Sequence, residues 1–158
     1  DDNVCTNNFG FLICQDMYTK SFRGDTSDYV KGKDTYIATG MRNDTDAYAN
    51  KIIKTRLKAG ITEGSGGTTS WTKNDLKLSL GSCGFSWKLD SYDEKNKIAT
   101  VTVTVTDIFD FNKDDKGNRD ADAEKLTALG RKAELSSYNV EVTYELQIKV
   151  SIPLTEEK

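Results

Sequence analysis

Histidine is missing from this sequence, and proline occurs once. Without histidine, the chain cannot form a Ser-His-Asp or Cys-His catalytic relay, and it cannot hold a metal through an imidazole. Proton transfer would therefore depend on Asp, Glu, Tyr, Lys or Cys. The single proline, Pro153, lies just past the last predicted strand, so no proline interrupts the elements before it.

Long apolar runs and an excess of charge of one sign are missing as well. The 22 basic and 25 acidic side chains are interspersed and leave a net charge of −3. No basic stripe marks a nucleic-acid surface, so we expect no nucleic-acid partner. No apolar run approaches the length of a membrane span or has the pattern of a signal peptide, so we expect no stable membrane span.

Cysteine is also scarce. The three cysteines, Cys5, Cys14 and Cys83, are too few for a four-ligand zinc site. Cys5 and Cys14 can close a short disulfide loop, either can pair with Cys83, or one or all can be buried thiols. The abundance of Thr, Ser, Asn, Asp and Tyr is typical of an exported protein. We therefore expect a secreted or extracellular protein.

The length of 158 residues fits a single domain with a real core. We expect residues 1–34 to form a loop-rich lead-in and residues 35–158 to form the core. Within the lead-in, the apolar residues 9–14 predict one short strand or helical turn. Residues 64–70, rich in Gly, Ser and Thr, predict a flexible loop. Residues 75–81 carry leucines at alternate positions and allow either a strand or a short helix.

The clearest helical signal covers residues 44–60. Apolar side chains recur there at helical spacing, Asp44 or Thr45 can cap the start, and Gly60 can end the helix. A second, short helix is predicted near residues 121–129.

Alternation of polar and apolar residues predicts strands in the second half of the chain. Residues 85–90 and 98–106 are typical of a hairpin around the polar turn at residues 93–97. The longest alternation covers residues 140–152, and a strand of this length with one polar face belongs in an antiparallel sheet. We predict an α+β fold: an antiparallel, strongly twisted sheet with one packed amphipathic helix, residues 44–60, and a second short helix.

Acidic and aromatic residues alternate directly after the predicted strand at residues 98–106, beginning at Asp107. Asp107 and Asp110 are candidate catalytic residues, because carboxylates held close together separate their pKa values and one of them can act as an acid or base near neutral pH. Alternatively, Asp107 only ends the strand and Asp110 makes a turn, while Phe109 and Phe111 pack.

A candidate cation site follows in the same stretch. Asp110, Asn112 and Asp114 stand at alternate positions, and closely spaced oxygen ligands of this kind bind Mg²⁺ or Ca²⁺. A divalent cation is therefore the candidate cofactor. The EF-hand pattern is not met, because Asp115 stands where that loop has its glycine and Ala121 where it has its glutamate. The alternative is a solvated, acid-rich loop between a strand and a helix.

Several motifs follow one another along residues 71–138: Trp71, a Leu-Gly pair at 80–81, Phe85, an Asp-x-Phe-Asp-Phe motif at 107–111, and a Leu-Gly-Arg-Lys-Ala-Glu segment at 129–134. This order resembles that of bacterial polymorphic toxin and effector domains. Those domains often carry an Ala-Leu-Gly-aromatic stretch, then an Asp-x-Tyr/Phe-Asp-Phe/Trp motif, and then a helix with a similar Leu-Gly segment.

One branch with such a motif is the colicin M type, phosphodiesterases that cleave the lipid carrier of peptidoglycan precursors with magnesium. On this resemblance, Asp107 and Asp110 match the two motif aspartates, and Phe109 stands in place of the motif tyrosine. Arg119 matches the arginine of that group only approximately. The histidine that follows in that group has no counterpart in this sequence.

The resemblance implies an exported bacterial toxin or effector-type domain that acts on the envelope of a competing cell, with metal-assisted hydrolysis as its reaction. Asp107 and Asp110 would bind a divalent cation or perform acid–base work, and Arg119 would contact a phosphate-like group. The partner would be a cell-envelope component or a cognate immunity protein.

Two other functions fit the same sequence. One is a non-catalytic extracellular module that recognises a protein or glycan through loops beside the sheet. The other is a pore-forming toxin domain that inserts through the amphipathic face of the sheet.

Overall fold

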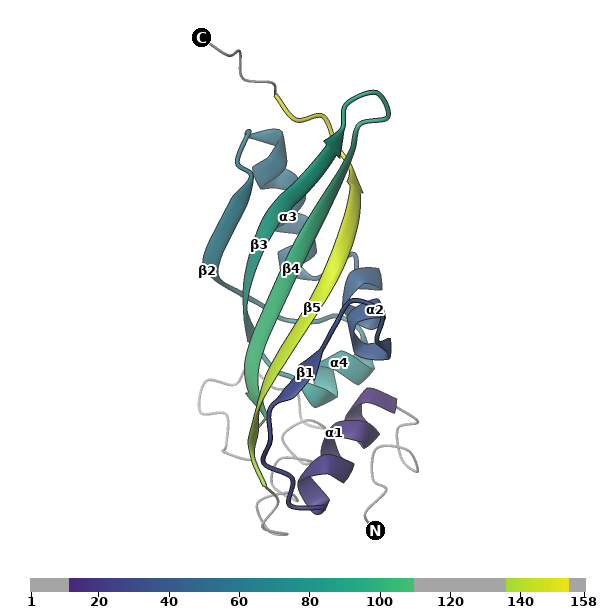
Figure 1. Cartoon of the computed structure of the whole chain (residues 1–158), viewed down its shortest axis with the longest axis vertical. Coiled ribbons are helices and arrows are strands. Elements are labelled where there is room, and N and C mark those ends of the chain that lie inside the picture. Colours follow the sequence, from purple (N-terminus) through teal and green to yellow (C-terminus); the bar gives the residue numbers. More distant parts are fainter. Residues whose placement is uncertain (1–11, 110–135, 154–158) are drawn as a thin grey trace.

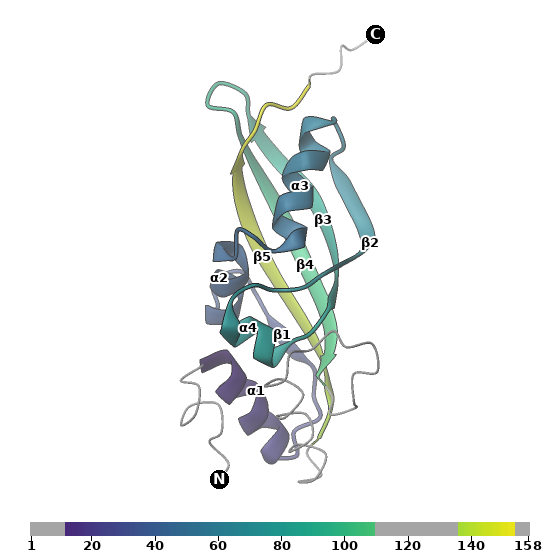
Figure 2. The same cartoon turned by 180° about the vertical axis from the view of Figure 1, so that it is seen from behind.

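The sheet and the helices that cover it are seen in a computed structural model, which describes residues 12–109 and 136–153 (Figure 1). The fold is α+β: a five-stranded, mostly antiparallel sheet carries helices on one face (Figure 2). The predicted fold class is therefore confirmed at this level.

The strands lie in the order β1-β5-β4-β3-β2 across the sheet. Their bounds are β1 (Tyr29–Lys31), β2 (Glu63–Thr69), β3 (Cys83–Asp93), β4 (Ile98–Phe109) and β5 (Tyr138–Lys149). The pairs β2–β3, β3–β4 and β4–β5 are antiparallel, as predicted. The prediction of a purely antiparallel sheet is wrong at one edge, because β1 pairs with β5 in parallel.

The alternation in β4 and β5 decides which face is buried. Val101, Val103 and Val105 are fully buried on the helix-covered face, and the register sets Val103 opposite Tyr144 and Val105 opposite Val142. Threonines of β4 occupy the other face. The predicted hairpin is confirmed, and the predicted strand at residues 140–152 ends earlier, at Lys149.

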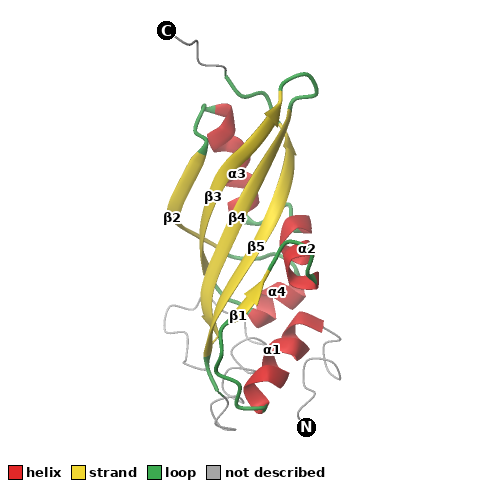
Figure 3. Cartoon of the chain, in the orientation of Figure 1, coloured by secondary structure: helices red, strands yellow, loops and turns green. Residues whose placement is uncertain are grey.

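Four helices lie within the described residues, where the sequence predicted one packed helix (Figure 3). Their bounds are α1 (Leu12–Phe22), α2 (Tyr36–Asn43), α3 (Tyr48–Lys58) and α4 (Asn74–Ser79). The short helix predicted near residues 121–129 lies outside the described residues. The helix predicted at residues 44–60 is α3, and it begins four positions later than Asp44.

The prediction that Asp44 or Thr45 caps α3 is wrong, because Ala47 is the N-cap residue. Asp44 is fully buried, and its carboxylate oxygens accept hydrogen bonds from elsewhere: Oδ2 from the Thr72 N–H at 2.8 Å and from the Lys73 N–H at 3.3 Å, and Oδ1 from the Thr72 hydroxyl. The carboxylate therefore ties the α2–α3 connection to the segment that leads into α4.

The C-terminal end of α3 is as predicted. Gly60 has a φ of +84°, a conformation that favours glycine. Its N–H bonds to the Leu57 carbonyl at 2.9 Å, and the Ile61 N–H bonds to the Arg56 carbonyl at 3.0 Å. These two bonds satisfy carbonyls of the last helical turn.

The loop-rich lead-in predicted for residues 1–34 is wrong over residues 12–22 and 29–31, which form α1 and β1. The carboxylate of Asp75 in α4 accepts hydrogen bonds from the Ile13 and Cys14 N–H groups, each at 2.9 Å. It satisfies donors that the first turn of a helix leaves unpaired, and its negative charge suits the helix dipole there. At mid-helix, the Tyr138 hydroxyl donates to the Met17 carbonyl at 2.7 Å.

The flexible loop predicted at residues 64–70 is wrong, since residues 63–69 form the edge strand β2. Gly64 and Gly67 let this strand approach two aromatic rings of β3. A Cβ atom added at Gly64 would lie 2.5 Å from Trp87 Nε1, and one added at Gly67 would lie 2.8 Å from Phe85 Cε1. The glycines therefore leave room for core rings. Residues 75–81, left open between strand and helix, contribute to the short helix α4.

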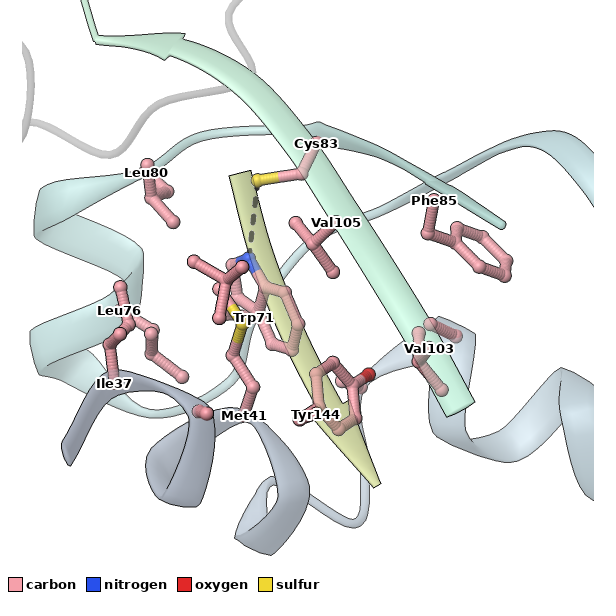
Figure 4. Close-up of a cluster of buried hydrophobic side chains, with 14 of the residues drawn as sticks. Ile37, Met41, Trp71, Leu76, Leu80, Cys83, Phe85, Val103, Val105 and Tyr144 are labelled. Carbon is pink, nitrogen blue, oxygen red and sulfur yellow. Dashed lines mark hydrogen bonds between the residues drawn. The ribbon is translucent and has the colours of Figure 1, made fainter. Parts of the chain in front are cut away.

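The core fills the space between the sheet and its helices (Figure 4). Trp71, from the β2–α4 connection, lies at its centre and donates through Nε1 to the Cys83 sulfur at 3.4 Å. Cys83 is a free, buried thiol, whereas Cys14 is disulfide-bonded. A disulfide to Cys83 is thereby excluded, and Cys5 lies outside the described residues.

Candidate functional site

A groove of about 730 Å³ lies at the end of the sheet where β4 finishes and β5 starts. We call it the end groove. The described residues that line it come from α1, the β1 region, the end of α4, the α4–β3 connection, the end of β4 and the start of β5. They are Tyr18, Asp28, Val30, Lys77, Leu78, Ser79, Leu80, Gly81, Ser82, Thr106, Asp107, Ile108, Phe109, Asn139, Val140 and Glu141.

The groove forms because β4 is longer than the strand beside it. The last pair between β3 and β4 joins Gly84 and Thr106, but β4 continues to Phe109 while paired with β5. Beyond Thr106, β4 is therefore paired with β5 alone, although the Cys83 side chain at the start of β3 still contacts Asp107. The register of β4 against β5 places Asp107 in this final stretch of β4, opposite Val140.

Asp107 continues the buried face of β4 and lies beside the only cysteine thiol among the described residues. The Cys83 sulfur is 3.7 Å from Asp107 Oδ2, to which the thiol donates. Burial raises the pKa of the Cys83 thiol, and the negative charge of Asp107 raises it further. The thiol is therefore protonated at neutral pH and is not an activated nucleophile.

The structure places one of the predicted site residues. Asp107 lines the end groove, while Asp110, Asn112, Asp114 and Arg119 lie outside the described residues. Their proposed catalytic and metal-binding roles therefore stay predictions. Within residues 12–109 and 136–153, no three His, Cys, Asp or Glu side chains come together as metal ligands would.

Two acidic residues of the groove were not singled out from the sequence. Asp28 precedes β1 and accepts from the Asn139 side chain at 3.4 Å, and Glu141 is an exposed residue of β5. Together with Asp107, they give the described lining three carboxylates and one ammonium group, that of Lys77. Asp28 comes into place only through the parallel pairing of β1 with β5, which joins distant parts of the chain.

Apolar side chains stand beside these acids. Val30 is 59% exposed and Ile108 is 58% exposed. Both occupy the sheet face opposite the helices, with Val30 opposite Glu141 and Ile108 opposite Asn139 in the register. Ile108 follows a run of threonines on that face, so an apolar residue at a polar position is visible in the sequence. The groove thus presents negative charge together with apolar surface.

Comparison of the chain with protein-family models, with curated proteins and with solved structures found no match. Among the described helices, none combines the length and the apolar character needed to cross a bilayer.

Proposed function

We propose that this chain is an exported, non-catalytic binding module that takes a ligand with a positive charge and an apolar part in the end groove. The observation that carries this proposal is the lining itself: Glu141 shares a sheet face with the exposed side chains of Val30 and Ile108, Asp28 lies just before β1, and Asp107 lines the groove from the other face. The volume of about 730 Å³ lies in the range of small-ligand sites.

One observation supports export, and two others support binding rather than catalysis. Disulfides persist mainly in oxidising compartments, and Cys14 is disulfide-bonded. The thiol beside the groove is protonated, and the sequence offers no histidine to activate a serine or cysteine. Carboxylates and apolar side chains of the described groove wall would then contact the ligand.

Dansylcadaverine, a primary amine joined to an apolar ring system, is a suitable probe of the end groove. We expect its fluorescence to report binding, and we expect the double variant Asp28→Asn/Glu141→Gln to weaken the affinity about tenfold. The reason is the loss of two partly exposed charge contacts, each worth up to about 1 kcal/mol.

Glu94→Gln is the matched control for that experiment. It removes one exposed acid from the β3–β4 turn, at the opposite end of the sheet (Figure 1). Its affinity should equal that of the unaltered protein. Failure of the probe to bind, or an unchanged affinity in the double variant, would contradict the proposal that the end groove binds the ligand.

The second candidate function is a toxin that hydrolyses an envelope component of a competing cell with a divalent cation, and that a cognate immunity protein would block. The position of Asp107 in the groove wall favours it, because the first motif aspartate then borders a ligand-sized space. The remaining groups of this proposal are Asp110, Asn112, Asp114 and Arg119.

Growth of a susceptible bacterium tests this candidate. Production of the protein in the periplasm is expected to stop growth, and Asp107→Asn/Asp110→Asn is expected to restore it, since paired carboxylates act as a unit. The double variant must keep its circular dichroism spectrum and melting temperature. Arrest that persists in the double variant, or unhindered growth with the unaltered protein, contradicts the hydrolase candidate.

A further inference from the structure

The outer edge of β5 is only partly covered. β5 pairs with β4 along its whole length, from Tyr138 to Lys149. On its other side it pairs with β1 at three residues, the last pair joining Val142 to Lys31. Within the described part of the chain, residues 143–149 thus have a strand neighbour on one side alone.

The hydrogen-bonding direction of the β5 backbone follows from one bond. The Val150 N–H donates to the Lys97 carbonyl of the β3–β4 turn at 2.9 Å. Because the backbone groups of an antiparallel strand point alternately to its two sides, the even-numbered residues of β5 turn toward β4. The N–H and C=O groups of Thr143, Glu145 and Gln147 therefore face the open edge.

A basic groove of about 740 Å³ runs along this edge, and we call it the edge groove. Its described lining is Arg42, Asn43, Thr45, Asn50, Lys51, Lys54, Glu145, Leu146, Gln147, Ile148 and Lys149. Four of these side chains are cationic and one is anionic. The anionic one, Glu145, already has a cation near it, since the Lys33 ammonium lies 3.9 Å from its carboxylate.

The cations lie where an added strand would present side chains. Arg42 lies in the last turn of α2, and Lys51 and Lys54 belong to α3. Figure 2 shows α3 on the covered face of the sheet and α2 beside its β5 edge. A strand added beside β5 would direct every second side chain toward that face. The edge groove therefore matches a backbone in extended conformation whose alternate side chains are acidic.

We propose that the edge groove binds an extended acidic polypeptide segment, which adds to β5 as a further strand of the sheet. The segment pairs its backbone with Glu145 and Gln147, and its carboxylates contact Arg42, Lys54 and the neighbouring lysines. Main-chain pairing at an open edge supplies affinity, and the pattern of side chains supplies specificity.

Charge decides between this partner and a second copy of the chain. Pairing of two β5 edges would bring two basic grooves together, and like charges at an interface oppose association. An acidic segment neutralises the same side chains. The edge groove shares no described lining residue with the end groove, so this proposal stands apart from the proposed ligand.

Fluorescence anisotropy with a fluorescein-labelled peptide of alternating Glu and Thr tests the proposal. Lys54→Glu and Lys149→Glu are each expected to weaken binding about tenfold, because an attractive contact becomes a repulsive one. The matched control is Lys95→Glu, which makes the same charge change in the exposed β3–β4 turn and should leave the affinity within about twofold. Equal affinities in all three variants would overturn the proposal.

Amide hydrogen exchange by NMR separates strand addition from simple charge attraction. Saturating peptide is expected to slow exchange at the amides of Glu145 and Gln147 at least tenfold, and to leave the Leu146 amide, which faces β4, unchanged. A peptide of alternating Glu and Pro has the same charge without the paired N–H groups, and it should bind at least tenfold more weakly. Equal binding of the two peptides, unchanged exchange at Glu145 and Gln147, or tighter binding of a single-stranded oligonucleotide would each overturn the proposal.

Discussion

Replacement of Asp44 by alanine is expected to lower the free energy of unfolding by about 3–5 kcal/mol, because hydrogen bonds to a charged group contribute about 1.5–3 kcal/mol each and their buried donors would be left unpaired. The carboxylate is fully buried and accepts from the Thr72 N–H, the Lys73 N–H and the Thr72 hydroxyl. No other group of the α2–α3 connection is seen to bond these donors among the described residues. Urea unfolding followed by circular dichroism measures the loss.

Asp46→Ala is the matched control for this variant. Asp46 stands two positions further on, its side chain is 75% exposed, and its ion pair with Lys51 is long, at 4.0 Å. Such a surface change is expected to stay within about 0.5 kcal/mol. Equal losses for Asp44→Ala and Asp46→Ala would show that the buried carboxylate does not hold α2, α3 and the segment before α4 together.

Replacement of Tyr144 by alanine is expected to cost a similar amount, about 3–5 kcal/mol, because a large, fully buried ring leaves a cavity. Its hydroxyl donates to Asn50 Oδ1 at 2.7 Å, and the Asn50 amide donates in turn to the Met41 and Asp44 carbonyls, each at 2.9 Å. Tyr144 therefore connects β5 to α3 and to the end of α2. Burial raises the pKa of its phenol, so the hydroxyl remains a donor over the physiological pH range.

Tyr144→Phe separates the hydrogen bond from the ring. It keeps the packing and leaves Asn50 Oδ1 without its donor, so we expect a loss of about 1–2 kcal/mol by the same urea titration. Tyr36→Phe is the control, since Tyr36 is 63% exposed and its hydroxyl should contribute little. If the Tyr144→Phe protein is as stable as the control, the Tyr144–Asn50 hydrogen bond does not contribute to the free energy of unfolding.

The strands of the central hairpin and β5 were predictable because one physical rule decides them. Alternate residues of β4 and β5 lie on a buried and a polar face, and this pattern is local in the sequence. The same reasoning located α3 and its end at Gly60. It did not locate the start of α3, because the Asp44 side chain bonds to Thr72 and Lys73 across the fold rather than to the first turn of the helix.

β2 and α1 were missed for tertiary reasons. The glycines of β2 suggest a loop when only local propensity is considered, yet Gly64 and Gly67 make room for Trp87 and Phe85 in the next strand. For α1, the amides of its first turn bond to Asp75, far along the chain. Neither contact can be inferred from the neighbouring residues alone.

The residues of the candidate site likewise include one that the sequence predicted and others that it did not. Asp107 could be singled out because an acid at the end of a strand is visible in the sequence. Asp28 and Glu141 could not, since the β1–β5 pairing that brings them to one groove is parallel and long-range. A sequence pattern indicates that β5 has a polar face, but it does not indicate which distant segment lies beside that face.

The parallel pairing of β1 with β5 also bears on how the chain folds during synthesis. The ribosome produces Tyr29 long before its register partner Val140. Until β5 emerges, β1 has no strand edge on which to pair, whereas the β3–β4 hairpin needs only adjacent residues. Loop closure over so long a separation is costly and slow, so the N-terminal segment is the natural last step of folding. A nascent chain waiting for that step exposes the apolar face of α1, which makes this segment a natural target for chaperones.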